Sequence, residues 1–307
     1  MGSARRSDRR VAPVTDVEPP APAAQGGGRL VLVATPIGNL GDLSPRAIEA
    51  LAGSALICCE DTRRTGKLLQ HAGVRGVRMA VTNDHTEHAR IAEVLDLLAA
   101  GRDVAVVSDA GTPGISDPGE RLVRAVVTAG HTVSAVPGPA ALVMALVLSG
   151  FDTTRFAFEG FLPRSGSDRS RRLAEIADEH RSVVLYEAPH RVARTIDDLA
   201  ARCGASRRVC LARELTKLHE DVWRGTLAQA AVHITDRAPR GEYVIVIEAA
   251  PPPAPSDDAA ITVALAAEMA RGASRKAAVA TVTTGLGASK RRVYDIATSL
   301  PRYEAPR

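Results

Sequence analysis

Two turns rich in glycine and proline follow two short apolar segments near the middle of the chain, and they most constrain how it can fold. The apolar segments cover residues 103–108 and 131–136, and a helical pattern over 118–129 lies between them. Short β-branched runs of this kind are typical of buried strands. In an open sheet that alternates strands and helices, ligands bind where strands end and backbone groups are free. The two turns therefore predict a small-molecule pocket built largely from backbone.

The composition of these turns also excludes some ligands. Glycine permits close approach and positive φ, and proline stiffens the chain. Neither turn has the G-x-x-x-x-G-K-[ST] or the G-x-G-x-x-G pattern, so neither predicts an ordinary nucleotide-phosphate site. Asp109 lies at the predicted tip of the first strand, where its carboxylate would accept a hydrogen bond from a ribose or stabilise a cation.

The whole sequence predicts an α/β protein with several parts. Residues 1–28 lack apolar periodicity and predict a disordered tail, whereas residues 29–149 alternate apolar runs with helical patterns, as a mostly parallel sheet requires. Residues 150–250 predict a second α/β domain with fewer helices between its strands. Residues 251–256 are expected to form a stiff linker, and residues 257–307 a small, basic, helix-turn-helix-like unit.

Composition places the chain among soluble globular proteins. Of its 307 residues, 45% are hydrophobic and 24% are charged, and no apolar run is long enough to span a membrane. The arginines near the start are not followed by an apolar leader segment. The four cysteines lack zinc-ligand spacing, so we expect small buried hydrophobes in a reducing compartment and no metal site. We therefore expect a cytoplasmic protein, and its net charge of +4 permits an anionic partner.

Seven ordered segments between residues 29 and 250 resemble a known family. They are LVATPIGNLGDLSPRAIEAL, EDTRRTGKLL, VVSDAGTPGISDPG, VPGPAAL, FEGFLPR, YEAPHR and LARELTKLHE. They are similar to segments of the small-subunit ribosomal RNA cytidine 2′-O-methyltransferases of the tetrapyrrole (corrin/porphyrin) methylase superfamily. The resemblance implies two α/β domains with the active site in the cleft between them, a homodimer, and S-adenosylmethionine as cofactor. It also implies that the substrate is a cytidine ribose in the 16S RNA of the small ribosomal subunit.

The resemblance further implies which residues hold the cofactor. They are Pro36, Asp109, Thr112, Ala140, Ala141 and Tyr186, together with the turn before Tyr243. Many members of the superfamily have G-D-P at the first strand tip, whereas this chain has Ser108-Asp109-Ala110. That difference follows the RNA-modifying branch and argues against a corrin substrate.

A methyl transfer to a ribose hydroxyl needs in-line alignment of the reacting atoms and benefits from a general base. Glu187 is the first candidate for this role, followed by Glu214, Lys217 and His85. Lys217 suits phosphate binding better than proton transfer. A structural role would explain the presence of these carboxylates equally well, because Arg213 could form an ion pair with Glu214 or Glu187 that holds two strands together. An isolated histidine is also more often structural or solvated than catalytic.

Basic residues near the predicted strand ends are candidates for RNA contacts. They are Arg63, Arg64, Arg164, Arg169 and Arg213. We expect residues 163–172 to form a mobile basic loop at the cleft, although such charge runs are usually solvated surface. Helix capping by Asp61 or Thr62 would explain the cluster around Arg63 and Arg64 equally well.

Two other functions remain open on the sequence alone. The first is methylation of a tetrapyrrole carbon by another enzyme of the superfamily. The second is a non-enzymatic DNA-binding regulator that uses the C-terminal helices, where Lys290-Arg291-Arg292 opens a predicted helix. The basic segments and the missing G-D-P favour RNA methylation over both.

Overall fold

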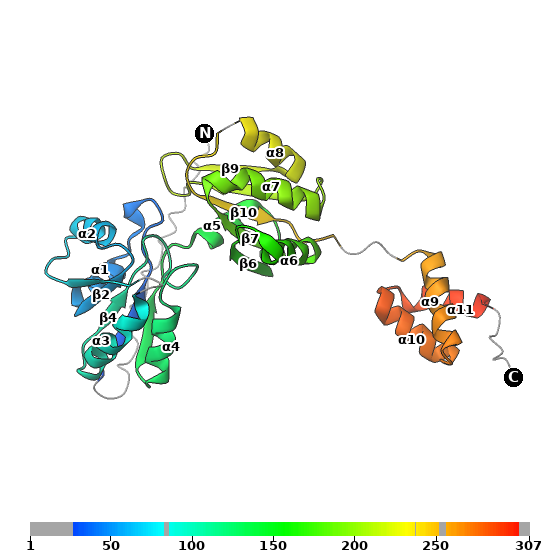
Figure 1. Cartoon of the computed structure of the whole chain (residues 1–307), viewed down its shortest axis with the longest axis horizontal. Coiled ribbons are helices and arrows are strands. Elements are labelled where there is room, and N and C mark those ends of the chain that lie inside the picture. Colours follow the sequence, from blue (N-terminus) through cyan, green and yellow to red (C-terminus); the bar gives the residue numbers. More distant parts are fainter. Residues whose placement is uncertain (1–26, 83–85, 237, 252–255, 301–307) are drawn as a thin grey trace, which may run out of the picture. The chain divides into compact units, whose positions relative to one another are not determined.

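The computed structural model describes residues 27–82, 86–236, 238–251 and 256–300. The chain separates into two units, Met1–Glu248 and Ala249–Arg307. The first unit contains two five-stranded sheets, and the second contains helices (Figure 1). The expected tail and linker lie largely outside the described residues, so the predicted domain boundaries stay predictions.

The first sheet is fully parallel, as the alternating pattern predicts. Its strand order is β3-β2-β4-β1-β5, and every strand pair runs in the same direction. Its strands are β1 (Arg29–Val33), β2 (Leu56–Cys59), β3 (Arg78–Val81), β4 (Val104–Val106) and β5 (Thr132–Val136). The parallel order brings the loops after β1, β2, β4 and β5 to one edge of the sheet, which is where ligands bind in such folds.

Helices cover both faces of this sheet. One apolar cluster joins its strands to α1 (Pro45–Gly53) and α2 (Thr62–His71), and another joins them to α3 (Glu87–Ala99) and α4 (Glu120–Thr128). The short 3-10 helix η1 (Leu40–Asp42) precedes α1. Since both faces are covered, the strands are almost continuously apolar. Cys58 and Cys59 are buried free thiols in β2, as expected, and burial raises the pKa of Cys58 to about 11.

The second sheet is mixed, with the order β6-β7-β10-β8-β9. Only β6 and β7 are parallel, and the other pairs are antiparallel. Its strands are β6 (Phe156–Phe161), β7 (Ser182–Glu187), β8 (Arg208–Arg213), β9 (Asp221–Thr226) and β10 (Tyr243–Ile247). Because β10 is antiparallel to both of its neighbours, its first residues lie beside the last residues of β7 and β8. Backbone from three strands therefore meets at one edge.

The helices of this second sheet divide between its two faces. An apolar cluster on one face includes α6 (Gly166–Asp178), α7 (Pro189–Cys203) and α8 (Leu227–Asp236), and a cluster on the other includes α5 (Ala141–Ser149). The expected boundary after residue 149 assigns α5 to the first domain, yet its buried face packs on the second sheet. The prediction of a mobile loop at residues 163–172 is wrong for most of that segment, because α6 begins at Gly166.

The described residues of the C-terminal unit form three helices with a core of their own. They are α9 (Asp258–Ala270), α10 (Arg275–Leu286) and α11 (Lys290–Ser299), and Ile261, Leu265, Val282 and Val293 are buried among them. Gly287 ends α10 with a left-handed φ of 58°, a backbone conformation that glycine adopts without strain. Among the residues that the structure describes, none of the helices has the length and apolar character needed to span a bilayer.

Candidate active site

A cavity of about 370 Å³, which we call the main cavity, opens between loops of the first sheet and the strand ends of the second sheet. Five of the residues expected to hold a cofactor line it: Asp109, Thr112, Ala140, Ala141 and Tyr186. Backbone near Ala188 and Tyr243 completes the wall on the side of the second sheet. The paired turns of the sequence thus meet at one cavity.

The loop after β4 is held in place by backbone pairing and by one hydroxyl. The amide of Gly111 donates to the carbonyl of Thr35 over 3.0 Å, and the amide of Thr35 donates back to the carbonyl of Gly111 over 2.8 Å. Thr112 Oγ1 donates to the carbonyl of Pro139 over 3.1 Å, which joins the two predicted turns directly. Ser116, in the same loop, has a φ of 61°, a strained conformation for a residue with a Cβ.

Tyr186 forms an aromatic wall of the main cavity together with its neighbours in β6. Its ring lies edge-on to Phe158 with centroids 5.0 Å apart, and Phe161 is 5.7 Å away. Its hydroxyl accepts a hydrogen bond of 3.2 Å from the amide of Leu142 in the first turn of α5. The second sheet thereby fixes the start of α5, where Ala140 and Ala141 line the main cavity.

Acidic side chains gather at the base of the loop after β4. Asp109 forms an ion pair of 3.2 Å with Arg64, while the amide of Asp109 donates to Glu60 over 3.0 Å. The Oδ1 atom of Asp109 is buried and has no hydrogen-bond partner within the described part of the chain. Burial raises the pKa of Asp109, although Arg64 opposes the shift.

Asp117 lines the main cavity and was not singled out in the sequence. Burial raises its pKa to about 7, and the charges of Glu60 and Asp109 add to the shift while a hydrogen bond from Ser108 opposes it. The segment Ser116-Asp117-Pro118 has the composition of an ordinary turn, so the sequence alone gave no reason to select Asp117 as a site residue. Its raised pKa depends first on burial and then on carboxylates that the fold brings from the ends of β2 and β4.

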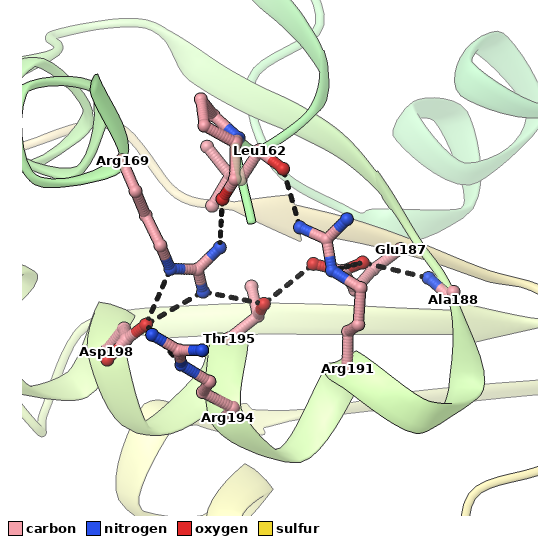
Figure 2. A network of polar contacts seen from close by, with 9 residues as sticks. Leu162, Arg169, Glu187, Ala188, Arg191, Arg194, Thr195 and Asp198 are labelled. Carbon is pink, nitrogen blue, oxygen red and sulfur yellow. Dashed lines mark hydrogen bonds and ion pairs between the residues drawn. The ribbon is translucent and has the colours of Figure 1, made fainter. Parts of the chain in front are cut away.

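Glu187 also lines the main cavity, but its oxygens are already occupied. Thr195 donates to Oε2 over 2.7 Å, the amide of Ala188 donates to Oε1 over 2.9 Å, and Arg191 lies 3.1 Å from Oε1 (Figure 2). The side chain is 1% exposed. This arrangement holds the turn between β7 and α7 and does not favour proton abstraction by Glu187.

Arg169 belongs to the same network and does not reach solvent. Its guanidinium donates to Asp198 over 2.8 Å, to Thr195 over 3.0 Å and to the carbonyl of Pro163 over 2.9 Å (Figure 2). The residue is 4% exposed. The expectation that Arg169 contacts RNA is therefore wrong, because its donors are used inside the fold.

Lys217 is held between two carboxylates near the main cavity. Its Nζ lies 2.8 Å from Glu214 and 3.0 Å from Glu242, and Glu242 lines the cavity. Burial lowers the pKa of Lys217, but the hydrogen bonds that its ammonium donates to these carboxylates, together with their charges, outweigh burial and leave that pKa above its usual value. A raised pKa makes this ammonium a poor proton acceptor.

The segment after β8 that carries Lys217 is strained and touches the loop after β1. Glu214 and Thr216 have φ values of 50° and 67°. Thr216 Oγ1 accepts from the amide of Asn39 over 3.1 Å, and a Cβ on Gly38 would lie 2.3 Å from Lys217 Cγ. Glycine is thus required at position 38 for the two segments to meet.

The two carboxylates that were candidate ion-pair partners of Arg213 pair with other cations. Glu187 pairs with Arg191, and Glu214 pairs with Lys217. Arg213 lines a small cavity of about 20 Å³ beside Asp221 and Trp223.

The other predicted residues have diverse surroundings. Asp61 caps α2 by accepting from the amide of Arg63 over 2.7 Å, so the capping interpretation is confirmed. The side chain of Arg63 is 91% exposed, and Arg164 is also exposed. His85 lies outside the described residues. Across the part of the chain that is described, no group of three or more His, Cys, Asp or Glu side chains is arranged to hold a metal ion.

A second cavity of about 270 Å³, which we call the side cavity, adjoins the main one and shares Arg64 and Asp109 with it. Pro36, the sixth residue expected to hold the cofactor, lines this cavity instead of the main one. Lys67 also lines it and was not recognised as a site residue in the sequence. Only the winding of α2 places Lys67 beside Arg64.

Comparison with known proteins identifies the family. Residues 29–231 match the family described as Tetrapyrrole (Corrin/Porphyrin) Methylases. A ribosomal RNA small subunit methyltransferase I of Synechocystis sp. is 45% identical over 276 residues, which cover 89% of this chain and 98% of that protein. A protein of the same name from Xylella fastidiosa is 48% identical over 237 residues, or 76% of this chain and 85% of that protein.

Solved structures share the fold at much lower identity. The methyltransferase CobJ matches with a TM-score of 0.56 and 21% identity, over 73% of this chain and 95% of that chain. A diphthine synthase matches with a TM-score of 0.55 and 13% identity, over 72% and 89% of the two chains. These structures share the fold, and the family match over residues 29–231 together with the relatives of 45% and 48% identity shows that the chain belongs to the tetrapyrrole (corrin/porphyrin) methylase family.

Proposed function

We propose that this protein is an S-adenosylmethionine-dependent methyltransferase that methylates the 2′-oxygen of a cytidine ribose in small-subunit (16S) ribosomal RNA. The observation that carries the proposal is the main cavity, where five of the residues expected to hold the cofactor come together. Relatives that are 45% and 48% identical and bear the name of a ribosomal RNA methyltransferase support the choice of substrate.

The main cavity fits S-adenosylmethionine in size and chemistry. Its volume of about 370 Å³ falls within the range of about 300–1,000 Å³ that is typical of small-molecule sites. Backbone at Thr112, Ala140, Ala188 and Tyr243 would hold the cofactor, and the buried Asp109 oxygen that lacks a partner among the described residues offers an acceptor. When bound, the cofactor supplies a methyl group on a positively charged sulfur.

The residues of the chain have separate tasks in this reaction. The cavity walls align the acceptor oxygen, which supplies much of the catalysis of an in-line displacement. Asp117 takes the proton of the ribose hydroxyl, because it faces the main cavity and its pKa of about 7 makes it basic near neutral pH. Glu187, Glu214 and Lys217 are positioning residues that hold the walls through their ion pairs.

The substrate contacts and the assembly complete the proposal. Arg63, Arg64, Arg164 and Arg213 contact RNA in the small ribosomal subunit, so the protein works in the cytoplasm. A homodimer buries the exposed apolar face of α5, where Val147 is 61% exposed in the single chain.

Transfer of a labelled methyl group tests the proposed function directly. The purified protein is incubated with labelled S-adenosylmethionine and either small ribosomal subunits or uroporphyrinogen. We expect label in ribosomal RNA, at a cytidine that resists alkaline cleavage because its 2′-oxygen is blocked. Label in the tetrapyrrole alone would instead establish the alternative, a carbon methyltransferase. Mass spectrometry of the RNA identifies the modified nucleotide.

Deletion of residues 257–307 separates the enzyme from the regulator hypothesis. Loss of the helical unit should weaken RNA capture and leave methyl transfer measurable at high RNA concentration. A DNA-binding regulator would lose all function with these helices.

A further inference from the structure

The side cavity adjoins the main cavity, which we propose holds the methyl donor. It shares Arg64 and Asp109 with the main cavity, so these two residues form the boundary between the two spaces. Methyl transfer requires the acceptor atom to approach the cofactor within the reach of a single displacement. A space that adjoins the cofactor cavity is therefore the natural site for the acceptor nucleotide.

Size separates the side cavity from the other neighbour of the main cavity. The small cavity beside Arg213 also touches the main cavity, through Tyr243, but its volume of about 20 Å³ is too small for a nucleotide. The side cavity, at about 270 Å³, is large enough for the sugar and phosphate of one residue.

The charges lining the side cavity favour an anion. Its charged lining residues are the cations Arg64 and Lys67 and the carboxylate of Asp109, which leaves one excess positive charge. Asp109 already pairs with Arg64 over 3.2 Å. No ion pair of Lys67 with a carboxylate occurs among the residues that the structure describes. Its ammonium is therefore the cation left to meet a phosphate.

Apolar side chains complete the lining. Pro36, Leu40 and Leu68 face the side cavity, and Leu40 remains 45% exposed. A nucleotide combines a charged phosphate with apolar faces of ribose and base, so it matches a site where Lys67, which forms no ion pair within the described part of the chain, lies beside apolar surface. A free phosphate would use only the cation.

We propose that the side cavity binds the nucleotide that is methylated, with Lys67 on a flanking phosphodiester and Leu40 against the ribose or base. This assignment rests on the proposed function, since it names where the RNA substrate of that reaction lies. Arg64, which pairs with Asp109 over 3.2 Å, lines both cavities and so lies between the cofactor and the nucleotide.

Substitution of Lys67 tests the assignment with the full-length protein. The variants are Lys67→Gln and Lys67→Glu, and Arg75→Gln is the matched control because Arg75 is exposed after α2 and lines neither cavity. Methylation of small ribosomal subunits is measured against subunit and salt concentration, and cofactor affinity is measured by calorimetry. Binding of a labelled single-stranded RNA is followed by fluorescence anisotropy, with no dependence on methyl transfer.

We expect Lys67→Gln to raise KM for the subunits by about tenfold and to leave kcat and cofactor affinity near the parent values. The slope of log RNA affinity against log salt concentration should fall in magnitude by about one, because one phosphate contact is lost. Lys67→Glu should have the larger effect, and Arg75→Gln should match the parent. A further variant, Leu40→Trp, should raise KM by filling the side cavity without any change of charge.

Each contrary result has a distinct meaning. Parental KM, salt slope and RNA affinity in both Lys67 variants would overturn the assignment, as would an equal loss in Arg75→Gln. If the parent binds RNA but transfers no methyl group to it, the proposed function fails. The anisotropy difference between the parent and Lys67→Glu would then still decide whether the side cavity binds RNA.

Discussion

Two groups of carboxylates line the same cavity and have opposite surroundings. Asp109 and Asp117, on the loop after β4, have raised pKa values, and one oxygen of Asp109 has no partner among the described residues. Glu187, at the end of β7, is more deeply buried, yet Thr195, Ala188 and Arg191 satisfy it. Burial alone therefore does not mark a reactive carboxylate. The number of donors around it decides whether it is free to take a proton or holds the fold.

The largest expected effect is on turnover and comes from the first group. Asp117→Asn removes the proposed proton acceptor with little change of shape, and kcat should fall by about 100-fold or more. In the parent, kcat should rise with pH through about 7 as Asp117 ionises. Rapid-quench measurement of methyl transfer from pH 5 to 9 checks both statements. A variant that keeps the parent rate and pH profile would remove Asp117 from the chemistry.

The next largest effect is on stability and comes from the second group. Glu187→Ala leaves Arg191 and Thr195 without their buried acceptor, and the free energy of unfolding should fall by about 3 kcal/mol. Asp168→Ala is the control, because its ion pair with Arg171 is exposed and contributes at most about 0.5 kcal/mol. Urea denaturation measures both variants. Equal losses would show that the Glu187 network does not stabilise the fold as described.

Asp109→Ala should have a smaller effect, on cofactor affinity. The carboxylate lines the main cavity and offers an unpartnered acceptor, so its removal should raise the dissociation constant of S-adenosylmethionine about tenfold, the value of one good hydrogen bond. Isothermal titration calorimetry provides the measurement. An unchanged dissociation constant would show that Asp109 makes no direct contact with the cofactor.

A further expected effect is a pH dependence of stability. Folding raises the pKa of Asp117 from 3.8 to about 7, so the folded protein binds this proton more tightly than the unfolded chain does. The resulting stabilisation is complete below pH 3.8 and is lost as the pH rises through about 7. Relative to the parent, Asp117→Asn should therefore gain stability between these two pH values. Thermal melts of both proteins across the range would reveal a constant difference if the pKa is not raised.

Much of the fold could be predicted from local pattern. The alternation of apolar runs and helices over residues 29–149 predicted a parallel sheet, and the sheet is parallel. Strand β9 and helix α8 were missed, because Asp221–Thr226 is polar and only half-buried at the sheet edge and so lacks a clear apolar alternation.

Local pattern likewise predicted some residues of the candidate site and not others. The turns at Asp109 and Ala140 could be placed, because glycine and proline at strand ends constrain the backbone locally. Arg169 could not, because its burial depends on Asp198 and Thr195 from another helix. Lys67 and Asp117 were also not recognised, since the cavities that they line are formed by residues distant in the chain.

The sequence by itself determined the strand and helix order over residues 29–149, the turns that build the main cavity, and the family to which the chain belongs. Those features depend on backbone conformation and apolar periodicity, which act between residues close in the chain. Only the tertiary structure decided which charged side chains are satisfied and which face a cavity, since that depends on the donors and acceptors that folding brings near them. Asp117 and Glu187 are both acids that line the main cavity, and only their neighbours in space distinguish the proposed proton acceptor from a carboxylate held by structural hydrogen bonds.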